Sequence, residues 1–448
     1  MNSARLSAEI SGFSLKTPLS WTKKATCSSP ETKKENKMNE KLIEKYARLI
    51  ACAGANIGAG EEVVIYSSVE THSFARVLAK ECYLAGASAV RVDFRDDELT
   101  KLSCEHRTKK DFCRIYPWET AKMRYRAEKH HIRIYIDSES PNSLDGIDRT
   151  KYDAAQHARY KKFKKYIDMA QGMEKWVVAA YPSRDWAKVV FPNDDENTAF
   201  EKLLSAILES VNVNEENDPI AAWQAHDAAL HARCEKLNKY KFDHLEYKSA
   251  NGTDFRVWLI PETHWCGGGE FTKTGKYFSA NMPTEEIFIS PRAGKAEGKL
   301  VSAMPLSYNG QLIDKFSVTF KDGKVADFSA EVGYEQLKTM IGSDEGARML
   351  GEVALVPKGN GIARQGILFY STLFDENASC HVALGEGYID TVDDYASRTL
   401  EECRALGINE SRIHVDFMIG ADDLSIVGYK DGKGTKIFEN GTFTKEFE

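Results

Sequence analysis

The sequence predicts an α/β N-terminal domain with a mostly parallel sheet, followed by an α+β C-terminal domain rich in antiparallel sheet. From residue 40 to about residue 215, apolar strand-like runs alternate with helical stretches, the pattern of a parallel sheet crossed by helices. Residues 210–217 are polar and mark the boundary, so the domains are predicted at 38–217 and 218–448. Beyond it, short strands are broken by Gly, Asn and Asp-Gly turns, which favour antiparallel hairpins.

Residues 1–37 differ in composition from the rest of the chain. They contain eleven Ser or Thr and seven Lys or Arg, with little apolar periodicity. No apolar core suits a secretory signal, and a single Arg gives weak support for an organelle transit peptide. We expect a disordered tail or an upstream start, with the first helix beginning at Met38.

The first domain should contain four strands and several helices. The strands are predicted at residues 62–66, 89–94, 132–137 and 176–182, and helices at 70–86, 97–108 and 196–211. The first of these helices carries Phe74, Val77, Leu78, Cys82 and Leu84 on or near one face. The glycine-rich stretch 54–60 precedes a strand instead of following one, so it is interpreted as a helix-ending turn and not as a phosphate-binding loop.

The second domain should open with a helix. Asp218 and Pro219 suit an N-cap and a first-turn proline. Apolar residues then recur at helical spacing, namely Trp223, Leu230, Cys234 and Leu237. Residues 312–320 alternate as a strand, and Asp-Gly pairs at 322–323 and 431–432 predict hairpin turns.

Composition excludes several classes of function. The chain has 448 residues and a net charge of −7, which argues against a nucleic-acid binder because such proteins concentrate basic residues. No apolar run reaches the roughly 18 residues that a membrane span requires. The nine cysteines are scattered with no Cys-x-x-Cys spacing, which favours reduced thiols and a cytoplasmic location.

Six side chains in the last third of the chain are candidate metal ligands, because most lie in or beside apolar, strand-like runs. They are Glu286, Glu352, Glu376, His381, His414 and Asp416. Burying a carboxylate in such a run costs several kcal/mol or more unless a cation compensates it. Four carboxylates and two imidazoles exceed the needs of one divalent ion, so the set predicts two metals and a dinuclear hydrolase.

Spacing alone supports some of these candidates more than others. His414 and Asp416 are two residues apart and would share one face of a strand, although an exposed amphipathic strand would show the same pattern. Glu285 and Glu286 are neighbours, so alternation does not say which of them enters the site. Glu352 could instead be a solvated strand end.

Two familiar hydrolase patterns are missing from the sequence. There is no His-Glu-x-x-His motif and no Gly-x-Ser-x-Gly elbow. The remaining histidines lack comparable partners, and His130 with His131 is interpreted as a solvated pair.

Five segments, in this order, resemble the thermophilic-type bacterial metalloaminopeptidases, the family of aminopeptidases T, S and II. The segments are residues 279–288, 305–314, 350–357, 373–381 and 414–420. The resemblance runs from about Met38 to the C-terminus. It implies a homodimeric aminopeptidase that acts on peptides with a free N-terminus, with no nucleic-acid or membrane partner, and that uses two divalent ions, zinc or cobalt with manganese or magnesium as alternatives.

The resemblance also assigns roles to residues. It implies that all six candidates are ligands, with Glu352 shared by both metals and Glu286 chosen over Glu285. Glu285 is then the candidate general base by analogy, with an outward-pointing neighbour as the alternative. Tyr388 matches a site tyrosine and is a candidate donor to the oxyanion, with a buried structural role as the alternative.

Two rival classes remain at this point. A dinuclear phosphoesterase could use the same ligands, but it would need Arg or Lys clamps that these motifs largely lack. A non-catalytic binding protein should have lost ligands, and none is missing. The segments around residues 359–364 and 389–394 depart from the family pattern, so the shape of the substrate pocket is left open.

Overall fold

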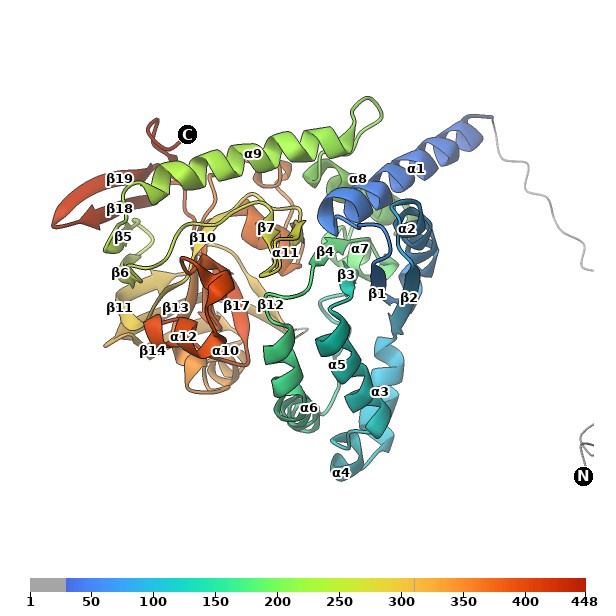
Figure 1. Ribbon diagram of the computed structural model, residues 1–448, viewed down its shortest axis with the longest axis horizontal. Coiled ribbons are helices and arrows are strands. Elements are labelled where there is room, and N and C mark those ends of the chain that lie inside the picture. The colour runs from blue at the N-terminus through green and yellow to red at the C-terminus, as the bar shows by residue number, and fades with distance from the viewer. Residues whose placement is uncertain (1–29, 310) are drawn as a thin grey trace, which may run out of the picture. The chain divides into compact units, whose positions relative to one another are not determined.

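A computed structural model describes residues 30–309 and 311–448 of the chain (Figure 1). Residues 1–29, most of the predicted tail, lie outside the described part. Helix α1 is Pro30–Leu49, so it begins at Pro30 and not at Met38, and residues 30–37 are helical. Proline fits the first helical turn, where its missing N–H needs no partner, and the Lys- and Glu-rich residues after it are good helix formers.

The first half of the chain builds the predicted parallel sheet, with the strand order β2-β1-β3-β4-β9. The strands are β1 (Glu62–Ser68), β2 (Ala89–Arg95), β3 (Ile132–Asp137), β4 (Trp176–Ala180) and β9 (Asn281–Met282). All neighbours in this sheet are parallel. The four strands predicted for the first domain are confirmed. The fifth, β9, comes from the second half of the sequence.

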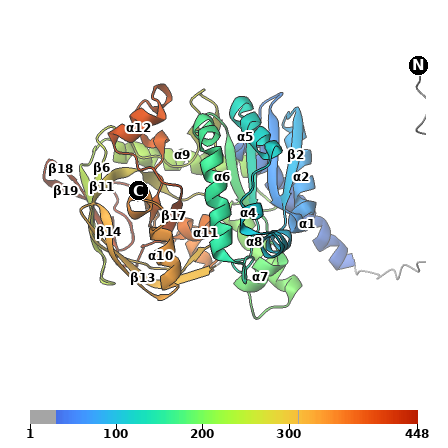
Figure 2. The same cartoon turned by 90° about the horizontal axis from the view of Figure 1, so that it is seen from below.

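Helices alternate along the chain with the strands of the parallel sheet. They are α2 (His72–Leu84), α3 (Asp97–His106), α4 (Lys109–Phe112), α5 (Pro117–Lys129), α6 (Arg149–Ala170), α7 (Arg184–Val190) and α8 (Glu196–Ser210). Apolar residues of α2 and α8 share one core cluster with β1, β3 and β4. Helix α6 lies between the parallel sheet and the antiparallel region (Figure 2), where Lys164 pairs with Glu410 at 3.0 Å.

The second half is rich in antiparallel sheet, as predicted. Its nine-stranded sheet contains β5 (His244–Lys248), β6 (Asp254–Leu259), β11 (Pro291–Val301), β12 (Leu306–Tyr308), β13 (Gln311–Lys321), β14 (Lys324–Val332), β18 (Ser425–Lys430), β19 (Lys433–Glu439) and β20 (Thr442–Phe443). The predicted Asp-Gly turns join β13 to β14 and β18 to β19. A hairpin, β7 (Glu270–Phe271) and β8 (Tyr277–Phe278), and helices α10 (Tyr334–Ile341), α11 (Thr372–Asp375) and α12 (Leu400–Leu406) complete this half.

A separate four-stranded sheet has the order β10-β15-β16-β17. Its strands are β10 (Ile287–Ile289), β15 (Leu350–Leu355), β16 (His381–Gly385) and β17 (His414–Met418). All its pairings are antiparallel. One face packs into the core of the second half through Val353, Leu355, Val382, Leu384 and Phe417, which leaves the other face free for polar side chains.

Helix α9 (Pro219–Asn238) starts at the predicted Asp218 cap, whose side chain accepts a hydrogen bond from the Ile220 N–H. It contributes Trp223 to the core of the first half and Leu237 to the core of the second. The domain boundary at residues 217 and 218 stays a prediction, because residues 42–448 form one compact unit. Among the described helices, none combines the length and apolarity needed to cross a membrane.

Candidate metal centre

The free face of the four-stranded sheet gathers the polar residues that the sequence singled out. Glu352 on β15 lies opposite Ala383 on β16, and Ala383 lies opposite Asp416 on β17. Directly paired residues of neighbouring strands share a face, so the two carboxylates flank a methyl group. The small side chain of Ala383 leaves room between them. The role of Ala383 was not predicted, because one sequence does not reveal the register between neighbouring strands.

Two histidines complete this face. His414 stands two residues before Asp416 on β17, as the strand spacing predicted. His381, the first residue of β16, is two residues from Ala383 and therefore projects on the same side. Glu286 directly precedes β10, which pairs with β15.

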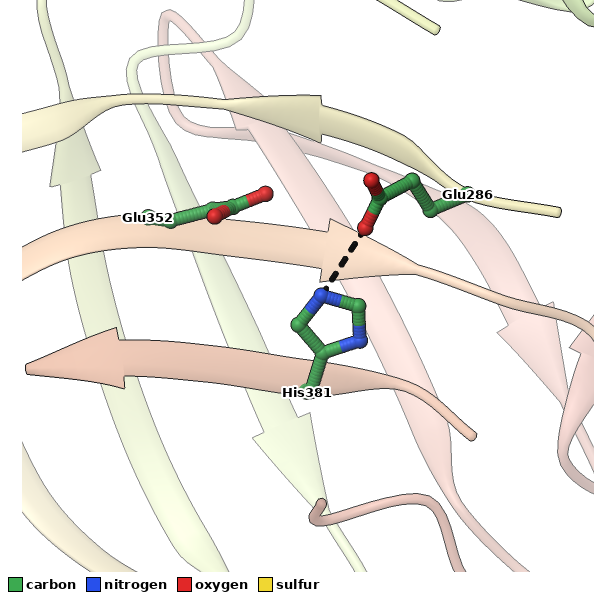
Figure 3. Close-up of side chains that lie close together, drawn as sticks. All are labelled: Glu286, Glu352 and His381. Carbon is green, nitrogen blue, oxygen red and sulfur yellow. Dashed lines mark ion pairs between the residues drawn. The ribbon is translucent and has the colours of Figure 1, made fainter. Parts of the chain in front are cut away.

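The ligand atoms form two overlapping groups. In the first, the ligand atoms of Glu286, Glu352 and His381 all lie within 4.8 Å of one another, and His381 Nε2 is 3.0 Å from Glu286 Oε2 (Figure 3). In the second, His414 Nε2 is 3.1 Å from Glu352 Oε2 and 3.3 Å from Asp416 Oδ1. Within the described residues, Glu352 is the one member common to both groups.

Both imidazoles present the same nitrogen to the cluster. His381 Nδ1 faces the backbone carbonyls of Glu376 and Ser379 at 3.0 Å, and His414 Nδ1 faces the carbonyl of Glu386 at 2.7 Å. Donation from Nδ1–H to a carbonyl fixes the tautomer and leaves the Nε2 lone pair for a cation. This is the arrangement of histidines that bind metals.

Glu376 is the candidate that neither three-residue group contains. It lies in a short 3-10 turn, Glu376–Ala378, and is buried. Burial raises the pKa of its carboxyl well above the ordinary value, and the charges of Asp416 and Glu286 add to the rise. The carboxylate is therefore within electrostatic reach of the cluster.

Glu285 faces a different set of groups. Burial raises the pKa of its carboxyl, whereas His226, Arg233 and Arg364 oppose the rise. Its backbone N–H donates to Asn377 Oδ1 at 2.6 Å. The structure thus places Glu286 in the cluster and Glu285 outside both ligand groups, beside positive charge.

Tyr388 stands over the cluster and lines the cavity beside it. Its hydroxyl is 3.2 Å from His414 Nε2, and its ring packs edge-on against Phe288. Ser290 and Thr391 hold its backbone, since the Tyr388 N–H donates to Ser290 Oγ at 2.8 Å and the Thr391 hydroxyl donates to the Tyr388 carbonyl at 2.7 Å. Sequence reasoning missed these two supporting residues, which carry no motif.

The residues present fit divalent cations. The four carboxylates are each less than a tenth exposed, and none of them forms an ion pair with a Lys or Arg of the described chain. Asp416 Oδ1 is buried and has no hydrogen-bond partner among these residues, despite its proximity to His414. Four buried carboxylates with only two imidazoles and no Lys or Arg beside them carry an excess of negative charge that is costly to keep unless cations bind there, and oxygen and imidazole donors suit such ions.

Comparison with known proteins agrees with this chemistry. The family described as thermophilic metalloprotease (M29) matches residues 39–443. The chain belongs to this family. It is 38% identical to aminopeptidase AmpS of Bacillus subtilis over 90% of its own length and 98% of the relative's, and 37% identical to aminopeptidase 2 of Geobacillus stearothermophilus over 91% and 98%.

A solved structure extends the match to the fold. Wild-type AmpT from Thermus thermophilus superposes with a TM-score of 0.82 at 34% identity, covering 90% of this chain and 99% of that one. The M29 chain is therefore a metal-dependent hydrolase and an exopeptidase, and the resemblance stated from sequence is confirmed. Membership of a peptidase family decides against the phosphoesterase and the non-catalytic binding protein.

The cluster gives a pH-dependent prediction for the metal-free protein. When no cation is bound, burial and the nearby carboxylates raise the pKa of Glu352 to about 7, and the neighbouring carboxylates raise the pKa of His381 and His414 well above the ordinary value although burial alone would lower it. These groups hold more protons folded than unfolded, so their contribution to stability falls as pH rises from about 5 through 7 and beyond.

The measurement is thermal unfolding of metal-loaded and chelator-stripped protein at pH 5.5 and pH 8. The melting temperature of the stripped protein should fall further below that of the loaded protein at pH 8, by at least about 2 °C more than at pH 5.5. Glu139 and Asp375, whose pKa burial raises to about 7, titrate in both samples and cancel in the comparison. An equal gap at both pH values would contradict the charge balance described for the cluster.

Proposed function

We propose that the chain releases N-terminal amino acids from peptides by means of two divalent ions, held by Glu286, Glu352, Glu376, His381, His414 and Asp416. The observation that carries the proposal is the pair of ligand groups that share Glu352. When bound, two ions in such a site would supply Lewis-acid activation of a water and of the scissile carbonyl. Zinc or cobalt suits the mixed carboxylate and imidazole donors, and manganese or magnesium are the alternatives.

The residues around the ligands have distinct tasks. Tyr388 donates its hydroxyl proton in a hydrogen bond to the oxyanion of the tetrahedral intermediate. Burial and the charges of Glu352 and Asp416 raise the pKa of Tyr388 well above its ordinary value, so the hydroxyl keeps its proton near neutral pH. Glu285 is the proposed general base, which would accept the proton of the attacking water on a carboxylate oxygen; burial raises the pKa of its carboxyl above the ordinary value, and a higher pKa makes the carboxylate a stronger base.

The cavity beside the cluster supports cleavage from the end of a chain. Its volume is about 620 Å³, and Glu286, Tyr388 and His414 form part of its wall. A substrate whose α-amine lies beside the Glu286 carboxylate gains a charge-assisted contact that an internal residue of a peptide lacks. We therefore assign the free α-amine as the group that fixes the cleavage site.

Blocking the α-amine tests this assignment. N-acetylation of a good tripeptide substrate should lower kcat/KM by at least about 100-fold, because the neutral amide loses a charge-assisted interaction of about 2–3 kcal/mol. Mass spectrometry of the products checks the result, with the unblocked peptide as the control. Cleavage of both peptides at similar rates, or cleavage of internal bonds first, would overturn the assignment of the α-amine as the group that fixes the cleavage site.

The cellular setting is proposed on separate grounds. The eight cysteines of the described chain are all free, which supports a reducing, cytoplasmic compartment. The homodimer is proposed from the family resemblance. Peptides with a free N-terminus are the proposed partners of the site.

A further inference from the structure

The cavity beside the metal centre reaches well beyond the ligands, to the parallel sheet of the first half. Besides Glu286, Tyr388 and His414, its wall includes Arg133 and Trp176, which pair across strands β3 and β4. A peptide whose first residue lies at the cluster therefore extends toward groups that the proposed chemistry does not use.

Those groups include two partly buried arginines, Arg126 and Arg133, which we call the arginine pair, and the buried Glu174 that both of them contact. Arg126 of α5 donates from Nε to both carboxylate oxygens of Glu174, at 3.0 and 3.1 Å. Arg133 Nη2 lies 2.7 Å from Glu174 Oε1. The side chain of Glu174 is 3% exposed, and those of Arg126 and Arg133 are 17% and 12% exposed. Two guanidinium groups against one carboxylate leave a net charge of about +1.

Strand alternation directs Arg133 toward the cavity. On β3, Ile132, Ile134 and Ile136 belong to the core cluster, whereas Arg133 alternates with them and is only partly buried. The buried Nε atom of Arg133 has no hydrogen-bond partner among the described residues. A buried donor without a partner is costly, so this guanidinium has capacity for a further acceptor.

The other arginines of the cavity wall are matched in charge by carboxylates, although Arg404 Nε, like Arg133 Nε, is buried without a hydrogen-bond partner among the described residues. Arg404 lies 3.4 Å from Glu386 Oε1 and 3.2 Å from Glu410 Oε1. Arg412 Nε lies 3.7 Å from Asp344 Oδ2. Of the four arginines that line the cavity, the arginine pair thus has the uncompensated positive charge.

We propose that the arginine pair binds the C-terminal carboxylate of short peptide substrates whose N-terminus lies at the metal centre. The inference rests on the proposed function and names its substrate class, namely short peptides with a free acid end. Guanidinium groups match the geometry of a carboxylate, and a low-dielectric wall strengthens the contact. Because both ends are fixed by rigid elements, one peptide length should fit best.

The test compares peptides of increasing length as free acids and as C-terminal amides, with the metal-loaded enzyme. At the preferred length, the free acid should have a kcat/KM at least about 10-fold above that of its amide, mainly through a lower KM. Arg133→Gln should raise KM for the acid by a similar factor and leave the amide unchanged. Arg133→Lys should restore part of the preference. Arg184→Gln, at an exposed arginine paired with Glu196 at 3.3 Å, is the matched control.

Each outcome decides the inference. Equal kcat/KM for acid and amide at every length in the wild type would overturn it while leaving the aminopeptidase activity in place. An equal loss for acid and amide in Arg133→Gln would show a merely structural role and overturn it too. If the metal-loaded enzyme cleaves neither the acid nor the amide, both the inference and the proposed function fail. Should Arg133→Gln not fold, the wild-type comparison alone decides.

Discussion

Replacing Glu352 with Gln should lower turnover by at least about 1,000-fold and leave fewer than two metal ions per chain. Glu352 is 3% exposed and belongs to both ligand groups, so one neutral substitution should weaken both proposed metal sites. An amide has a single neutral acceptor oxygen and a donor in place of the second one. Loss of a direct ligand should exceed the 10–100-fold cost that is usual for residues that merely support ligands.

Metal analysis and kinetics on the same preparations check this result. Glu285→Gln is the matched control, because it makes the same chemical change at a residue outside both ligand groups. It should keep the metal content of the wild type and lose turnover, because Glu285 is the proposed general base. If Glu352→Gln retains two tightly bound ions and near-normal turnover, Glu352 does not bridge the metals.

Strand periodicity predicted most of the parallel sheet, because Ile132, Ile134 and Ile136 alternate with polar residues as a half-buried strand requires. The helices between the strands were harder to predict. Helix α6 has few buried residues along its length, so it lacks the apolar stripe on which periodicity depends. Its start depends on a local signal, the Asp148 side chain that accepts from the Lys151 N–H.

In the candidate site, too, some features follow from the sequence of one segment and others depend on segments far apart in the chain. The pairing of His414 with Asp416 follows from strand spacing within one segment. The alignment of Glu352 with Asp416 across Ala383 depends on the register of three strands, which one sequence does not reveal. Glycine is also required at position 385, opposite His414 on the neighbouring strand, for a reason that depends on the folded structure. Its φ is 116°, and a Cβ there would approach the Ile413 carbonyl oxygen to 1.9 Å.

The choice between Glu285 and Glu286 shows most clearly what a single sequence does not reveal about the site. Alternation sends neighbours to opposite sides, and the family resemblance selected Glu286. The structure places Glu286 Oε2 at 3.0 Å from His381 Nε2. The groups whose positive charge lowers the pKa of Glu285, against the effect of burial, are instead His226, Arg233 and Arg364. Which side of a strand faces a site depends on the sheet that the strand joins, and β10 joins β15 from a segment far away in sequence.

Replacing Tyr388 with Phe should lower kcat by about 100- to 1,000-fold, with KM and metal content nearly unchanged. The loss of one oxyanion donor has that magnitude in other hydrolases. The phenyl ring should keep the packing against Phe288 and the position beside His414, so the substitution removes the hydroxyl and little else. The loss therefore belongs to the transition state and not to substrate binding.

Tyr395→Phe is the matched control, since Tyr395 also lines the cavity but donates its hydroxyl to the backbone carbonyl of Phe271. It should keep kcat within about threefold of the wild type, because its hydroxyl serves the fold and not the reacting carbonyl.

The metal content of Tyr388→Phe separates the two roles open to that residue. The Tyr388 hydroxyl lies 3.2 Å from His414 Nε2, so a residue that only orients this ligand would lose metal along with turnover. Full metal content with a low kcat identifies the hydroxyl as the donor to the oxyanion, whereas a parallel loss of both would reassign Tyr388 to holding His414 in place.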